Sequence, residues 1–197
     1  MRKIVVLAAC LLGAALVPAA SAVADTTTDS STVHAHVRDV NGGSLGTVTI
    51  STVSNGTKLL IQGRLSGLSA GFHGFHIHSV GICNPTATDP NGTVVPFFTA
   101  GGHLNPGGTG HGTHAGDLPS LKVAADGRTL AVVETDSVTL AQIFDADGAA
   151  FIVHAAPDNF AHIPARYSAA GVPGPDAATL ATGDAGARFA CGVIHRH

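Results

Sequence analysis

Short stretches in which apolar and polar residues alternate recur along the chain, separated by turn-forming residues. A period of two is typical of β-strands that bury one face. Turns such as Asn55-Gly56 and Asp126-Gly127 supply residues that tolerate positive φ angles, as tight hairpins require. The pattern predicts eight strands, at residues 33–40, 46–53, 58–65, 72–78, 118–124, 128–134, 150–154 and 189–194.

Eight short strands predict an all-β domain, either a sandwich of the immunoglobulin type or a barrel. Residues 138–144 form a short apolar run, which fits a helical turn or a strand equally well. Two long segments, 81–119 and 155–187, are rich in Gly, Pro, Asn and Asp and show no regular pattern. We expect both to be long loops, which in compact domains are usually functional.

The N-terminal residues have the pattern of an export signal. Arg2 and Lys3 precede an apolar run at 4–17, and small residues at 22–24 form a cleavage site. We therefore expect residues 1–24 to be a signal peptide, residues 25–197 to form a single domain, and the protein to be periplasmic, cell-envelope or secreted. Residues 7–10 also resemble a lipoprotein box, so acylation of Cys10 is the alternative that would tether the protein to a membrane.

Cleavage changes the charge and the cysteine count. The mature chain would keep eight basic and thirteen acidic residues, a formal charge of −5, which argues against nucleic acid as a partner. It would also keep two cysteines, Cys83 and Cys191. An even count in an exported chain predicts one intramolecular disulfide between them.

Histidines carry the most informative chemistry in the sequence. His76 and His78 lie two positions apart in a predicted strand, so both rings lie on one face. Further candidate ligands are concentrated between residues 103 and 117, and His154 ends another apolar strand. A ligand set rich in imidazole and poor in thiolate favours a functional copper or zinc centre.

Four motifs, in the same order, resemble signatures of the bacterial-type copper, zinc superoxide dismutases. The match runs from about residue 33 to 194, and the loop after residue 154 is similar to that of actinobacterial members. Together the motifs make the resemblance highly specific. They are Gly74-Phe75-His76-Ile77-His78, Gly101-Gly102-His103-Leu104-Asn105-Pro106, His114-Ala115-Gly116-Asp117-Leu118-Pro119, and Arg188-Phe189-Ala190-Cys191-Gly192-Val193-Ile194.

The resemblance implies an eight-stranded Greek-key β-barrel and two neighbouring metal ions. Asp158 would connect a copper-ligand histidine to a zinc-ligand histidine by hydrogen bonds, which fix ring orientation. His73 has the opposite strand parity to His76, so we expect it to face away from the metal and to be structural. The implied copper ligands are His76, His78, His103 and His154, and the implied zinc ligands are His103, His111, His114 and Asp117.

In such a family member, superoxide is dismuted to dioxygen and hydrogen peroxide. Arg188 would attract and dock the anion, and His103 would bridge the metals and carry a proton. Two alternatives remain. One is a copper-buffering protein on the same barrel, and the other is a copper-only dismutase, because His111 and His114 are only three residues apart. A homodimer is left open, and so are the roles of the remaining histidines, His34, His36, His162, His195 and His197.

Overall fold

The structure is a computed structural model that describes residues 33–196. The predicted signal peptide, Cys10 and His197 lie outside the described residues. Each of the eight predicted strands is present, with bounds that differ by at most two residues. They are β1 (Val33–Asp39), β2 (Ser44–Val53), β3 (Lys58–Leu65), β4 (Gly71–His78), β5 (Asp117–Val123), β6 (Thr129–Thr135), β7 (Ala150–His154) and β10 (Arg188–Val193).

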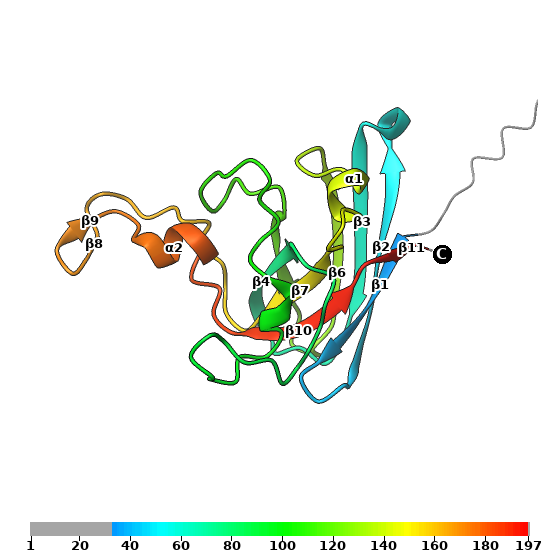
Figure 1. Cartoon of the computed structure of the whole chain (residues 1–197), viewed down its shortest axis with the longest axis horizontal. Coiled ribbons are helices and arrows are strands. Elements are labelled where there is room, and N and C mark those ends of the chain that lie inside the picture. The colour runs from blue at the N-terminus through cyan, green and yellow to red at the C-terminus, as the bar shows by residue number, and fades with distance from the viewer. Residues whose placement is uncertain (1–32, 197) are drawn as a thin grey trace, which may run out of the picture.

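These strands form one antiparallel sheet in the order β5-β4-β7-β10-β1-β2-β3-β6. The two edge strands, β5 and β6, approach one another, so the sheet curves into a nearly closed barrel (Figure 1). A short strand, β11 (His195–Arg196), pairs with β1 at its beginning. The prediction of an all-β, eight-stranded barrel is confirmed.

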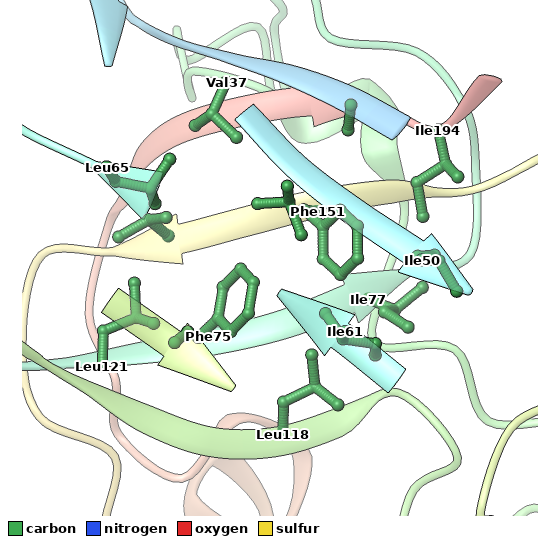
Figure 2. Close-up of a cluster of buried hydrophobic side chains, with 14 of the residues drawn as sticks. Val37, Ile50, Ile61, Leu65, Phe75, Ile77, Leu118, Leu121, Phe151 and Ile194 are labelled. Carbon is green, nitrogen blue, oxygen red and sulfur yellow. The ribbon is translucent and has the colours of Figure 1, made fainter. Parts of the chain in front are cut away.

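The barrel interior is filled by the inward-facing residue of each pleat. In β1 the buried side chains are Val33, Ala35 and Val37, and the residues between them are more exposed. At the centre, the rings of Phe75 and Phe151 stack with centroids 5.2 Å apart (Figure 2). Burial of large apolar side chains stabilises a fold by about 1.5–3 kcal/mol each, so this core fixes the strand register that positions the site.

Strand β7 is buried on both faces. Phe151 and Val153 point into the barrel, whereas Ala150 and Ile152 face outward into a second apolar cluster that contains Phe97, Ala100 and Cys191. The loop before His103, with its 3₁₀ turn η2 (Phe98–Ala100), supplies this outer cover. A disulfide joins Cys83 in that loop to Cys191 in β10, as predicted.

Segments that the sequence left without structure contain small elements. Residues 138–144, which fitted a helix or a strand, form α1 (Leu140–Ile143), because Thr139 and Gln142 make a capping box. The segment 155–187 was expected to be irregular, and this is wrong in part. It contains the hairpin β8 (Ser168–Ala169) and β9 (Val172–Pro173), and the helix α2 (Ala177–Thr182), which begins at the N-cap Asp176.

A shorter turn, η1 (Ser54–Gly56), connects β2 to β3. Within residues 33–196, none of the helices is long and apolar enough to cross a bilayer. The hairpin β8–β9 and α2 extend from one side of the barrel (Figure 1). The same long segment begins at His154 and returns to the barrel at Arg188, so it starts and ends at the candidate site.

Candidate metal centre

Strand pairing brings the candidate ligands together on the outside of the barrel. In β4, His76 lies opposite Asp117 of β5, and His78 forms an isolated bridge with His103. On the other side of β4 lies β7, whose last residue, His154, is opposite Arg188 of β10. Four neighbouring strands and one loop thus converge on one place.

The residues that were expected to hold copper form the four-histidine group: His76, His78, His103 and His154. One ring nitrogen from each lies within 4.8 Å of those of the others, and all four residues are buried. The ring centroids of His76 and His103 are 4.0 Å apart, and those of His76 and His154 are 4.9 Å apart.

Neighbouring groups orient three of these rings. His76 donates from Nε2 to Asp158 Oδ2 at 2.7 Å, His78 from Nδ1 to the carbonyl of Gly101 at 2.9 Å, and His154 from Nδ1 to the carbonyl of Gly186 at 3.0 Å. The remaining nitrogens, His76 Nδ1, His78 Nε2 and His154 Nε2, are buried without a hydrogen-bond partner in the described part of the chain. Buried polar atoms are rarely left unpaired, so these nitrogens fit a metal ion as their partner.

A second set, the histidine–aspartate group, consists of His103, His111, His114 and Asp117. Its candidate ligand atoms also lie within 4.8 Å of one another. Asp117 Oδ1 lies 2.9 Å from Nδ1 of His103 and 3.3 Å from Nδ1 of both His111 and His114. His103 belongs to both groups and turns its Nδ1 toward this one, so it is a candidate ligand that the two groups share.

The short spacing between His111 and His114 does not separate their rings, whose centroids are 5.4 Å apart. Asp117 closes the turn, because its Oδ2 accepts hydrogen bonds from the backbone of Gly112 at 2.7 Å and of His114 at 3.0 Å. One carboxylate therefore serves as a candidate ligand and also fixes the loop that carries two others.

Asp158 connects the two groups as the sequence predicted. It accepts from His76 Nε2 at 2.7 Å and from His111 Nε2 at 2.8 Å, and its side chain is fully buried. The backbone N–H of Phe160 donates a third hydrogen bond to it. His73, by contrast, is outside these groups: its Nδ1 bonds the carbonyl of His154 and its Nε2 the carbonyl of Ser69, which is a structural role.

Burial and charge give the two groups different protonation behaviour. Burial, together with the charges of neighbouring groups, lowers the pKa of His78 well below its usual value and that of His154 to about 3. Burial also lowers the pKa of His103 to about 4, although its hydrogen bond to Asp117 opposes this effect. These three imidazoles are therefore neutral at pH 7.

His111 behaves in the opposite way. Burial lowers its pKa, but hydrogen bonds to Asp117 and Asp158 and their negative charges outweigh that effect and raise the pKa to about 9. For each of the two carboxylates, burial favours the neutral form, but the hydrogen bonds from histidines are stronger and hold both pKa values far below the usual range. In the metal-free protein at pH 7, His111 is thus a cation that contacts two carboxylates, Asp117 and Asp158.

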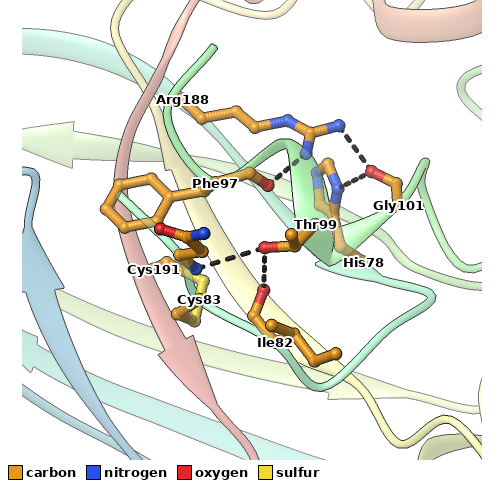
Figure 3. Close-up of a disulfide and its surroundings, with 9 residues drawn as sticks. His78, Ile82, Cys83, Phe97, Thr99, Gly101, Arg188 and Cys191 are labelled. Carbon is orange, nitrogen blue, oxygen red and sulfur yellow. Dashed lines mark hydrogen bonds between the residues drawn. A yellow bond between two sulfur atoms is a disulfide. The ribbon is translucent and has the colours of Figure 1, made fainter. Parts of the chain in front are cut away.

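A hollow of about 470 Å³ opens beside the four-histidine group. His78, His103 and His154 line it, together with Arg188 and Asp184. The guanidinium of Arg188 donates to the carbonyls of Phe97 and Gly101, so it is held at the wall of this hollow (Figure 3). A fixed cation in a partly buried hollow attracts small anions.

The sequence did not single out two residues that shape the site. Gly183, which follows α2, has a left-handed φ of 60°, and a Cβ there would overlap both Asp158 Oδ1 and His111 Nε2. A glycine directly after a helix is a recognisable signal for this conformation. Phe97, whose carbonyl contacts Arg188, adopts a left-handed φ of 59°, which no pattern in the sequence indicates.

Comparisons with known proteins agree with this geometry. The family described as copper/zinc superoxide dismutase matches residues 44–194. The superoxide dismutase [Cu-Zn] of Mycolicibacterium paratuberculosis is 47% identical over 152 residues, which are 75% of this chain and 62% of that protein. The chain thus spans less than two thirds of the length of this relative.

Two other relatives extend the likeness. Superoxide dismutase [Cu-Zn] 1 of Salmonella typhimurium is 36% identical over 79% of this chain and 80% of its own length. The solved structure of the Cu/Zn superoxide dismutase from Brucella abortus is 32% identical, has a TM-score of 0.61, and is matched over 83% of this chain and 99% of that one. The match therefore covers the fold, the motifs and most of the chain. This chain belongs to the copper/zinc superoxide dismutase family.

Proposed function

We propose that this protein is a superoxide dismutase that converts superoxide to dioxygen and hydrogen peroxide at a copper ion with a zinc ion beside it. One observation carries the proposal. Three buried, unpaired ring nitrogens, on His76, His78 and His154, converge with His103 next to the guanidinium-lined hollow. Imidazole ligands suit copper, and a hollow with a fixed cation in its wall suits the superoxide anion.

The four-histidine group would hold copper and the histidine–aspartate group would hold zinc. Neutral imidazoles accept both oxidation states of copper, and one carboxylate among imidazoles suits a divalent ion without redox chemistry. When bound, copper would supply the one-electron chemistry, taking an electron from one superoxide and giving it to the next.

The remaining steps belong to side chains of the chain. Arg188 binds and orients the anion, because its guanidinium is fixed by two carbonyls at the wall of the hollow. His103 lines the same hollow and has one ring nitrogen directed to Asp117. We assign to its other ring nitrogen the transfer of one of the two protons that hydrogen peroxide formation consumes.

The test is the decay of superoxide in stopped flow, with mature protein loaded with both metals. We expect decay far faster than in buffer with the same free copper. Arg188→Gln should slow it by at least about tenfold at low salt, whereas Arg64→Gln, at an exposed arginine of β3, should leave it unchanged. Stoichiometric copper binding without dismutation would contradict the proposal and favour a copper-buffering protein.

We also propose that the enzyme works outside the cytoplasm and removes superoxide there. The Cys83–Cys191 disulfide supports this location, because disulfides persist in oxidising compartments. The N-terminal sequence pattern of an export signal is consistent with it. Mass spectrometry of the protein recovered from fractionated cells tests the proposal. Mature chains beginning at Asp25 in the extracytoplasmic fraction support it, and full-length cytoplasmic protein contradicts it.

A further inference from the structure

The guanidinium of Arg188 depends on main-chain atoms for its orientation. One terminal nitrogen donates to the carbonyl of Phe97 and the other to the carbonyl of Gly101 (Figure 3). The Gly101 carbonyl also accepts a hydrogen bond from His78. A planar guanidinium held at two nitrogens cannot rotate freely, so the positions of these two carbonyls decide where it points.

Phe97 has a backbone conformation that bulky residues seldom adopt. Its φ of 59° and ψ of 20° lie in the left-handed region, where glycine is the usual residue. Such a conformation persists only when the surroundings enforce it. Those surroundings are apolar: Phe97 is only 2% exposed and packs in the outer cluster with Ile152 and Cys191.

Hydrogen bonds within the loop and the disulfide fix the backbone around Phe97. The N–H of Phe97 donates to the carbonyl of Asn84 at 2.8 Å. Thr99 donates from Oγ1 to the carbonyl of Ile82 at 3.0 Å and accepts from the N–H of Asn84 at 3.2 Å. The disulfide then connects this loop to β10, the strand that begins with Arg188.

We propose that Phe97 is a positioning residue for Arg188: its ring, anchored against the disulfide, keeps the backbone left-handed and thereby aims its carbonyl at the guanidinium. The consequence for superoxide rests on the proposed function. The effect on the arginine itself does not, because it depends only on packing and hydrogen bonds within the chain.

The first experiment measures the arginine without any metal. The metal-free, disulfide-bonded protein is treated with phenylglyoxal, which reacts with accessible guanidinium groups, and modification of Arg188 is followed by peptide mass spectrometry. Phe97→Ala should make this reaction several-fold faster. Val94→Ala, a truncation of an exposed apolar residue in the same loop, should match the unaltered protein. An unchanged rate in Phe97→Ala overturns the proposal.

Phe97→Gly serves as a second variant, and replaces the first if Phe97→Ala does not fold. Glycine accepts the left-handed backbone without strain but does not enforce it. We therefore expect an increase in the Arg188 reaction rate that is smaller than that of alanine. An increase equal to or larger than that of alanine would mean that only the ring volume matters, which contradicts a role for the backbone conformation.

Reduction of the disulfide tests the anchor. In the unaltered protein, reduction should speed modification of Arg188, because the loop that carries the Phe97 ring is then no longer covalently attached to β10. In Phe97→Ala, reduction should add little. An equal acceleration in both proteins would show that ring and disulfide act independently and would overturn the proposed anchor.

The kinetic consequence is measured last, on copper- and zinc-loaded protein with equal metal content. Phe97→Ala should lose roughly tenfold to a hundredfold in kcat/KM for superoxide, and its rate should depend less on salt than that of the unaltered protein. If the loaded, unaltered protein shows no dismutation, the proposed function fails. The phenylglyoxal rates would still decide the role of Phe97.

Discussion

The two ligand groups share His103 but are built differently. The four-histidine group has three members on β4 and β7, adjacent strands whose register is fixed by the barrel core. In the histidine–aspartate group only Asp117 lies on a strand, and its histidines lie in the loop before β5. The barrel therefore orients the first group, whereas the second depends on hydrogen bonds that Asp117 and Asp158 accept.

The histidines of the two groups also differ in their protonation. The pKa values of His103 and His154 lie at about 4 and about 3, so these imidazoles are neutral and ready to bind a metal at pH 7. His111, with a pKa of about 9, holds a proton that a metal must displace. Metal binding to the histidine–aspartate group therefore requires the loss of a proton from His111, whereas His103 and His154 already offer neutral imidazoles.

The largest effect is expected from removing the shared residue. His103→Ala should weaken binding of both metals and reduce dismutation by at least about a hundredfold, because neither group keeps its full ligand set. His162→Ala removes an exposed histidine outside both groups and is the matched control. Loss of only one metal in His103→Ala, measured by elemental analysis, would show that the groups do not share a ligand.

Asp158→Asn comes next, because it keeps the shape of the side chain but removes the charge that connects His76 to His111. The affinity for the metal of the histidine–aspartate group should fall by about 10- to 100-fold. The metal affinity of the four-histidine group should fall less, because backbone carbonyls still orient His78 and His154. Metal titrations measure both affinities, with Asp136→Asn at an exposed carboxylate as the control. Equal losses would contradict the contrast between strand and loop.

The number of protons released on metal binding distinguishes the two groups in the unaltered protein. At pH 7 zinc binding should release close to one proton from His111, whereas copper binding should release none from His103 or His154. Calorimetric titrations in buffers of different ionisation enthalpy count these protons. In His111→Gln the release on zinc binding should disappear, and an unchanged count would rule out His111 as its source.

The smallest effect concerns the stability of the metal-free protein. The pKa of His111 is raised above the unfolded value of about 6.5, so its stabilisation is complete below about pH 6.5 and is lost as the pH rises through about 9. For His103 and His154 the folded pKa is depressed, so stability is lost as the pH falls from about 6.5 toward about 4 and about 3.

Urea unfolding of the metal-free protein at a series of pH values between 3 and 10 measures both the alkaline and the acidic loss of stability. His111→Gln should remove the loss of unfolding free energy on the alkaline side. An alkaline loss that persists in His111→Gln would mean that another group causes it.

The sequence predicted the eight strands well, because alternation and turn residues are local signals. The choice of a barrel came from the family resemblance, and the disulfide between Cys83 and Cys191 from the even number of cysteines in an exported chain. The candidate ligands were found through motifs, and the structure brings all of them together. The sequence could not show contacts between residues that are distant along the chain. Gly183, directly after α2, packs against Asp158, and Arg188 bonds the carbonyl of Phe97, 91 positions earlier.

The spacing between His111 and His114 shows the same limit. From the sequence alone, a separation of three residues did not establish that both rings could reach one ion. In the structure, the hydrogen bonds from Gly112 and His114 to Asp117 fold the loop so that the two Nδ1 atoms lie at equal distances from one carboxylate oxygen.

The central claim, that two adjoining groups form two distinct metal sites, is tested most directly by elemental analysis of the mature protein after exposure to both metals and removal of the excess. The account predicts one copper and one zinc per chain. Copper alone would contradict it, because His111, His114 and Asp117 would then fail to form a metal site in spite of their convergence.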